Sequence, residues 1–379
     1  MKLKNFNNWW QRLLQILITG CLLFSLSFGL SGAFWDTEVY SPSTGKASTL
    51  AQGDAITDPK AILRYALPID NPTVRRLQAD IEGLSKNLRG KRWNQVASGV
   101  KDAKNILTIS QDKILNSVPE EKKQQAQTLL EEINSQIEEL QEKVAEKDKE
   151  GVWLTRKAIL DKIGDLEALM VQGFPFEIPE KYSDLPRLLG RATVKINTTK
   201  GDITVVVDGY NAPLTAGNFV DLVQRGFYQD LPIIRGGRDD FVVQTGKPPG
   251  EAEGFIDPKT KKYRKIPFEV LAKGDKEPTY EVTLEDLGRY LDPPVLPFNA
   301  YGAVGMARPE DDINAGSSQF FFFKFDRELT PPGYNLMDGR YAVFGYVVDG
   351  KEVLEELTTD DKIISAKVIE GAENLVQPE

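Results

Sequence analysis

Four segments in the N-terminal half repeat one spacing of apolar positions: i, i+4, i+7 and i+11. In a helix this spacing gives a single apolar stripe on an otherwise charged surface. The sequence therefore predicts four amphipathic helices that bury their stripes against one another. The stripe positions are Leu77, Ile81, Leu84 and Leu88; Val96, Val100, Ala103 and Leu107; Ile133, Ile137, Leu140 and Val144; and Ile159, Ile163, Leu166 and Met170.

Capping residues agree with this periodicity. Asn71 before Pro72 is typical of an N-cap followed by a first-turn proline, and Gly90 follows the end of the first striped helix. Pro119 opens the third. Together with a short leading helix after Asp58, these features predict a four- to five-helix bundle over residues 58–172.

A Pro-rich and aromatic stretch, residues 173–190, follows the bundle. Proline fixes φ and lacks an N–H donor, so we predict an extended connector. Beyond it the apolar period changes to that of strands, with Ala192, Val194 and Ile196 alternating with polar residues. The sequence thus predicts a domain boundary near residue 190 and a second domain over residues 191–379.

The second domain contains four consecutive phenylalanines, Phe320 to Phe323. Strand side chains alternate between faces, so Phe321 and Phe323 share one face and Phe320 and Phe322 the other. This predicts a sheet buried on both sides. We also expect a helix over residues 211–225 and a helical piece over residues 284–290.

Four ordered motifs of this domain resemble the cyclophilin family of peptidyl-prolyl cis-trans isomerases. They are FVVQTG (241–246), YGAVGMAR (301–308), GSSQFFF (316–322) and LMDGRYAVFG (336–345). Two further stretches, LRYALPIDNP (63–72) and DGYNAPLTAGNFVDLV (208–223), resemble the thylakoid-lumen cyclophilins of cyanobacteria and chloroplasts, which carry a helical domain before the isomerase. The resemblance implies a closed eight-stranded antiparallel β-barrel, capped by helices, after the bundle.

The chain has no histidine, which excludes Ser-His-Asp hydrolysis, Cys-His catalysis and imidazole-ligated zinc. Proline isomerisation needs none of these, because the barrier of about 18–20 kcal/mol arises from C–N double-bond character and no proton must move. An apolar grip on the proline ring and a cationic donor to the twisted amide suffice. We expect no cofactor and no metal.

The resemblance also implies the site residues. As catalytic residues it gives Arg235, Phe241, Gln244 and Phe321, with Arg238 as the alternative arginine because Leu231 to Asp240 aligns only with an insertion. As substrate-binding residues it gives Val242, Ala307, Gln319, Leu336, Met337 and Tyr341. Leu336 stands where the best-known cyclophilins have tryptophan and Tyr341 where they have histidine, so weak or absent activity is an alternative prediction.

The N-terminus has a basic and aromatic start followed by an apolar run over residues 13–30. We predict a signal peptide over residues 1–33, with an uncleaved membrane anchor as the alternative. A third interpretation is a lipoprotein cleavage box ending at Cys21, the sole cysteine. We predict that residues 34–57, which are rich in Ser, Thr, Gly and Asp, form a flexible segment.

The net charge argues against nucleic acid as a partner. At −9, with a pI near 5.0, the chain is a poor match for nucleic acid. The predicted function is a peptidyl-prolyl isomerase or foldase of the thylakoid lumen or periplasm. Its predicted partners are proline-containing polypeptide clients, including photosystem II subunits, and it would meet a membrane only through an uncleaved N-terminus. The alternatives are a catalytically weak chaperone or scaffold and an extrinsic structural subunit of a photosynthetic complex.

Overall fold

The structure is a computed structural model that describes residues 56–325 and 335–378. The predicted signal peptide or anchor (1–33), the lipoprotein box and most of the predicted flexible segment (34–57) lie outside the described residues. Across the two described ranges, no helix combines the length and the apolar composition that a membrane crossing requires.

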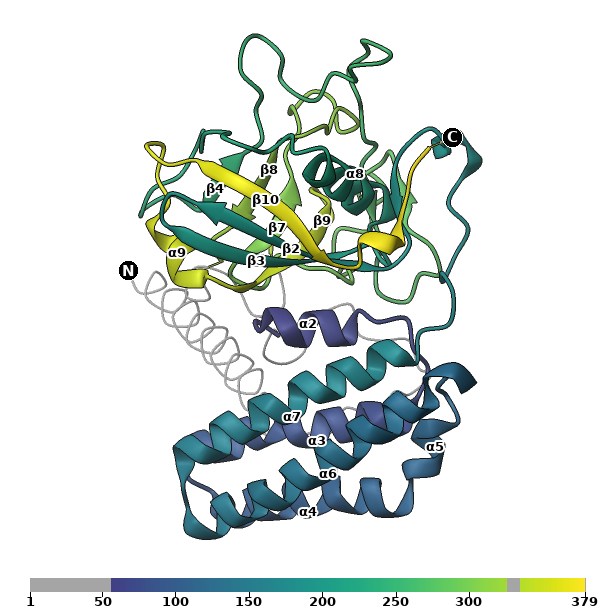
Figure 1. Ribbon diagram of the computed structural model, residues 1–379, viewed down its shortest axis with the longest axis vertical. Helices are drawn as coiled ribbons and strands as arrows, with labels where there is room; N and C mark the ends of the chain where they lie inside the picture. Colours follow the sequence, from purple (N-terminus) through teal and green to yellow (C-terminus); the bar gives the residue numbers. More distant parts are fainter. Residues whose placement is uncertain (1–55, 326–334, 379) are drawn as a thin grey trace, which may run out of the picture. The chain divides into compact units, whose positions relative to one another are not determined.

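Four long helices form the bundle: α3 (Pro72–Arg89), α4 (Trp93–Ile109), α6 (Lys123–Glu146) and α7 (Lys149–Leu169). Figure 1 shows them side by side, and α3 packs on α4, α4 on α6, α6 on α7 and α7 on α3. All sixteen predicted stripe residues are buried, which confirms the four amphipathic helices. A short helix, α5 (Gln111–Leu115), and a 3-10 turn (Glu120–Lys122) were not predicted.

The predicted N-cap is confirmed in detail. Asn71 Oδ1 accepts hydrogen bonds from the backbone N–H groups of Thr73 and Val74, both at 3.0 Å, at the start of α3. Its Nδ2 donates to Lys113 O at 3.0 Å and to Ser117 Oγ at 2.8 Å. One side chain therefore caps α3 and ties it to the segment after α4.

The leading helix α2 (Pro59–Tyr65) has two different faces. Ile62 and Leu63, together with Ala66 just after the helix, belong to the hydrophobic core of the β-rich domain and not to that of the bundle. Its polar side contacts α3, where Arg64 pairs with Glu82 at 2.9 Å. The predicted leading helix is present, and the structure shows that its apolar residues complete the second core.

One antiparallel sheet dominates the second domain. Its strands lie in the order β10-β2-β3-β9-β7-β8-β4. Their bounds are Ile363–Glu370 (β10), Arg191–Thr198 (β2), Gly201–Asp208 (β3), Val343–Asp349 (β9), Ala303–Met306 (β7), Phe320–Phe323 (β8) and Val242–Thr245 (β4). The expected antiparallel architecture of the resembled family is confirmed.

An irregular segment, Leu231 to Arg235, bridges the two end strands of this sheet. Ile363 at the start of β10 donates its N–H to Leu231 O at 2.8 Å, while Arg235 forms a two-bond antiparallel bridge with Gln244 of β4. The segment therefore fills the eighth position of the predicted barrel without forming a regular strand.

The four phenylalanines of β8 alternate as predicted. Phe320 and Phe322 face α8 (Pro213–Gln224), whose Phe219 lies 5.0 Å from Phe320 between ring centroids. Figure 1 shows α8 beside this sheet. Phe321 and Phe323 face the opposite way and pack on Phe298. The sheet is thus buried on both faces, with Phe323 at the edge of the buried region.

Smaller elements complete the domain. They are β1 (Arg187–Leu188) paired with β11 (Leu375–Val376), β5 (Glu269–Val270) paired with β6 (Thr279–Tyr280), helix α9 (Lys351–Glu356) and the 3-10 turns Glu180–Tyr182 and Ala372–Asn374. The connector is irregular up to its 3-10 turn, with bends at Gly173, Pro175 and Phe176, and Tyr182 anchors it by donating to Glu281 Oε1 at 2.9 Å.

The predicted helical piece over residues 284–290 is wrong, because the structure has a single turn there. Gly288 adopts a left-handed φ of 71°, and Arg289 donates its N–H to Leu284 O at 2.7 Å. Together with the bond from Gly288 N to Glu285 O, this is the arrangement that normally ends a helix. The glycine therefore stops the helix after one turn.

Candidate active site

Three of the predicted catalytic residues lie in one row across neighbouring strands. Gln244 donates its N–H to Arg235 O at 2.7 Å and accepts from Arg235 N at 3.3 Å. On its other side, Gln244 lies opposite Phe321 in the β4–β8 register. Directly opposed residues of antiparallel strands project from the same face. The backbone register thus brings the side chains of Arg235, Gln244 and Phe321 to one face.

Phe321 forms the aromatic part of this row. Its ring lies parallel to Phe298, with centroids 5.9 Å apart, and Tyr341 meets its edge at 5.7 Å and 89°. Gly305 lies opposite it on β7, and a Cβ there would come within 2.5 Å of Phe321 Cζ. The absence of a side chain at Gly305 is what lets the Phe321 ring lie flat.

A chain of amide contacts fixes Gln244. Its Nε2 donates to Gln319 Oε1 at 2.9 Å, and Gln319 Nε2 donates to Glu253 O at 2.7 Å. Ala307 N in turn donates to Gln319 O at 3.0 Å. Three predicted residues, Gln244, Ala307 and Gln319, are therefore linked in one hydrogen-bonded group.

The two candidate arginines occupy different positions. Arg235 lies in the bridge opposite Gln244, with its side chain largely exposed and Asp240 Oδ1 3.9 Å away. Arg238 lies in the exposed turn that follows, outside the row. The register thus aligns Arg235, and not Arg238, with Gln244 and Phe321.

The remaining predicted residues surround the row less closely. Val242 is half-buried on the same strand face as Gln244, and Met337 is half-buried against the core. Phe241 and Leu336 are 55% and 67% exposed, so both lie on the surface instead of packing into the aromatic cluster. Tyr341, standing at the family's histidine position, contacts Phe321 directly.

Sequence reasoning missed Arg308 as a site residue. Its guanidinium lies 4.7 Å above the Tyr341 ring, and its two Nη atoms each donate at 3.0 Å, to Pro309 O and to Arg340 O. It lines a hollow of about 350 Å³ together with Gln244, Glu253, Tyr263, Ala307 and Gln319. The signal was its place at the end of the YGAVGMAR motif, directly after Ala307.

A half-buried carboxylate, that of Asp338, supports the aromatic wall. Asp338 Oδ1 accepts the backbone N–H of Phe298 at 2.7 Å, and burial raises the pKa of the Asp338 carboxyl to about 7. Because Phe298 stacks on Phe321, Asp338 helps to position the site without lining it.

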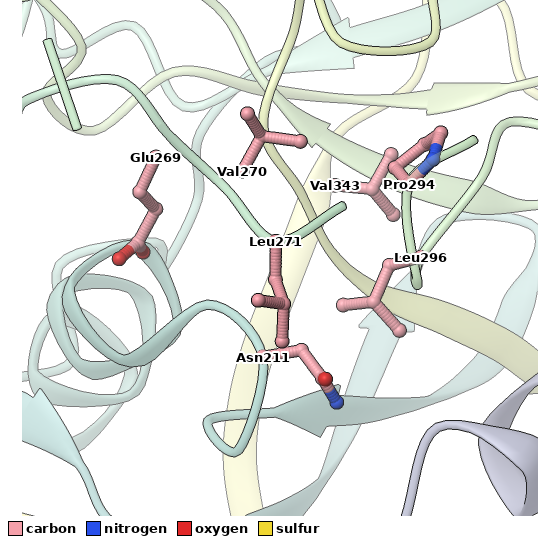
Figure 2. A pocket seen from close by; sticks show the side chains of 7 residues that line it. All are labelled: Asn211, Glu269, Val270, Leu271, Pro294, Leu296 and Val343. Carbon is pink, nitrogen blue, oxygen red and sulfur yellow. The ribbon is translucent and has the colours of Figure 1, made fainter. Parts of the chain in front are cut away.

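A fully buried carboxylate, that of Glu269, caps α8. Its Oε1 accepts the N–H of Thr215 at 2.6 Å, and burial raises the pKa of the Glu269 carboxyl to about 7. Figure 2 shows the hollow beside it, lined also by Asn211, Leu271 and Leu296. At about 10 Å³ this hollow has room for roughly one water molecule and none for a client side chain.

No group of three or more metal-ligating His, Cys, Asp or Glu residues occurs in ranges 56–325 and 335–378. The row itself consists of a cation, an amide and an aromatic ring: Arg235, Gln244 and Phe321.

Comparisons with known proteins define the class. Residues 193–373 match the cyclophilin type peptidyl-prolyl cis-trans isomerase family, and residues 58–171 match the CYP38-like, PsbQ-like domain of such isomerases. The chain therefore belongs to the cyclophilin-type peptidyl-prolyl cis-trans isomerases, as the motifs predicted.

Three individual isomerases are similar to this chain over most of its length. The chain is 58% identical, over 97% of its length and 96% of the relative's, to a Synechocystis protein named as a thylakoid lumen peptidyl-prolyl cis-trans isomerase, sll0408. It is 42% identical to the chloroplastic isomerase CYP38 of Arabidopsis thaliana, over 90% of this chain and 80% of the relative. Chloroplastic CYP37 from the same plant is 33% identical over 93% of this chain and 76% of the relative.

Proposed function

We propose that this chain isomerises X-Pro bonds of polypeptide clients at the row formed by Arg235, Gln244 and Phe321. The observation that carries the proposal is the register that places these three side chains on one face of adjoining backbone segments. Membership of the isomerase family supports the same assignment.

Each residue of the row has a chemical task. The proline ring would lie against the aromatic cluster of Phe321, and the guanidinium of Arg235 would donate to the imide nitrogen, which becomes a better acceptor as the amide twists. Gln244, held by Gln319, would orient the client backbone. Phe241, Val242, Ala307, Leu336, Met337 and Tyr341 complete the proposed binding surface.

The test compares two arginines of the segment that precedes β4, Arg235 and Arg238. Arg235→Ala should lower the isomerisation rate of a proline peptide by about 10²–10³, the usual loss for one such donor. Arg238→Ala is the matched control and should retain the rate. If Arg238→Ala abolishes the rate and Arg235→Ala spares it, the assignment is wrong.

One observation favours a second candidate function, a client-binding chaperone with little isomerase activity. Phe321 is only 4% exposed, with Phe298 stacked on its ring and Tyr341 packed against it at 89°. A proline would have to displace Tyr341, the less buried of these two neighbours, to reach the ring. Tyr341→Ala should then increase the isomerisation rate under this second function, and decrease it if Tyr341 only helps to hold the proline.

We further propose that the chain works in the thylakoid lumen and that its clients include photosystem II subunits. The name of the 58% identical relative and the PsbQ-like match of residues 58–171 support this proposal. Crosslinking of the full chain in thylakoids, followed by identification of the partners, tests it. Recovery in the cytoplasm would refute the location.

A further inference from the structure

The Arg308 guanidinium is held by two hydrogen bonds and still has N–H donors without a partner among the described residues. A guanidinium has five N–H donors, and the contacts to Pro309 O and Arg340 O use two of them. The Nε group has no hydrogen-bond partner among the described residues. The Tyr341 ring covers one face of the guanidinium and limits its motion. Each Nη therefore keeps one N–H for a ligand, in a fixed orientation.

Among the described residues, Arg308 has no local counter-ion. Of the acidic residues nearby, Glu253 pairs with Lys247 at 2.6 Å and Asp312 with Lys265 at 2.9 Å. Glu310 and Asp311 are exposed on the loop that follows Arg308. In ranges 56–325 and 335–378 no carboxylate lies within 4.0 Å of the Arg308 guanidinium.

The hollow that Arg308 lines adjoins the proposed proline site. Gln244, Ala307 and Gln319 belong to both. At about 350 Å³, the hollow has room for a side chain of the size of glutamate. A client whose proline lies against Phe321 would therefore place a neighbouring side chain beside Arg308.

We propose that Arg308 is a specificity-determining residue that binds the carboxylate of an acidic client residue flanking the proline. The inference rests on the proposed function, because that function places the proline on Phe321. Arg308 would donate its two remaining Nη hydrogens to the carboxylate, a charge-assisted pair that neutral glutamine cannot match. Clients with Asp or Glu next to the X-Pro bond would then be preferred.

The rival explanation is structural. Arg308 could serve only to hold Tyr341 against Phe321, and its loss would then weaken all clients to the same extent. The ratio of affinities for an acidic and a neutral peptide separates the two roles, because a positioning effect cancels in that ratio.

The experiment measures binding of fluorescent proline peptides to the full-length protein by fluorescence polarisation. Peptides carry Glu or Gln at one of the two positions on either side of the X-Pro pair. We expect the wild-type protein to prefer one Glu peptide over its Gln partner roughly fivefold at low salt, as an ion pair of about 1 kcal/mol gives. Arg308→Gln should reduce this ratio to about one, and Arg308→Lys should leave part of it. Lys367→Gln, which removes a positive charge from exposed β10, is the matched control and should keep the ratio.

Three outcomes overturn the inference. They are equal binding of all Glu and Gln pairs by the wild type, an unchanged ratio in Arg308→Gln, and an equal loss of ratio in Lys367→Gln, which would indicate net charge alone. Failure of the proposed function looks different: peptides would bind with a Glu preference but would not be isomerised, or Arg235→Ala would leave the rate unchanged.

Discussion

Replacing Glu269 by glutamine should change how the stability of the second domain depends on pH. Glu269 is 1% exposed, and its carboxylate accepts the N–H groups of Thr215 and Leu214 at the start of α8. Glutamine has nearly the same shape and keeps one amide oxygen for Thr215, but it carries no ionisable proton. The substitution therefore removes a titration while preserving most of the packing.

The size of the effect follows from the pKa. Burial raises the pKa of the Glu269 carboxyl from 4.5 to about 7, so the folded protein holds this proton more tightly than the unfolded chain does. The stability that the proton provides is fully present below pH 4.5 and is lost as the pH rises through 7. One pKa unit is worth about 1.4 kcal/mol, so wild-type protein should lose about 3 kcal/mol relative to Glu269→Gln between pH 4.5 and 7.5. Asp338, whose pKa burial also raises to about 7, is present in both proteins and cancels in the difference.

Urea denaturation at several pH values measures this difference, and the chain provides separate signals for its two parts. Of the described tryptophans, Trp93 and Trp153 lie in bundle helices α4 and α7. All described tyrosines except Tyr65 lie at residue 182 or beyond. Near-ultraviolet dichroism of tyrosine should therefore report the Glu269 effect most directly. Parallel pH profiles of the two proteins in the tyrosine signal would refute the reasoning.

Two further substitutions test the packing. Gly305→Ala should destabilise the second domain by about 1–3 kcal/mol and weaken peptide binding, because the new Cβ would displace Phe321 and Phe298. The control is Gly83→Ala in α3, where the new Cβ has no atom within 4 Å. This control should stabilise the bundle by about 1 kcal/mol. Asn71→Ala should cost the bundle about 2 kcal/mol in tryptophan-detected urea unfolding, one for the cap and one for the bonds to Lys113 and Ser117; a loss below 0.5 kcal/mol would contradict the role of Asn71 as both cap and tie.

Periodicity was sufficient for the bundle because each stripe has a single way to become buried, against the other stripes. It could not identify the partner of α2, since an apolar side such as Ile62 and Leu63 does not encode which core it joins. Alternation likewise predicted the two faces of β8. The helical pattern over residues 284–290 failed because one glycine, Gly288, ended it through a backbone angle that composition does not reveal.

The site residues were predicted from the motifs alone. The structure adds the pairing register of the strands, which a motif does not contain. Arg308 went unrecognised because its role comes from contacts with Tyr341 and two carbonyl oxygens that lie elsewhere in the chain or on the following residue. Phe241 matches the family pattern and Leu336 stands at the family's tryptophan position, yet both side chains lie exposed. A motif gives the residue type at a position, whereas its burial is decided by neighbours that the motif does not contain.

The position of Arg235 follows from the closure of the barrel. The segment from Leu231 to Arg235 is hydrogen-bonded to β10 at one end and to Gln244 of β4 at the other. Its last residue, Arg235, is the proposed catalytic arginine. The stretch that aligns only with an insertion, Leu231 to Asp240, includes the loop after Arg235 that joins the two partners of this bridge. An insertion there lengthens a surface loop, at a small entropic cost, without shifting the register of either partner. The barrel can therefore carry a longer loop than the family pattern and still hold Arg235 opposite Gln244.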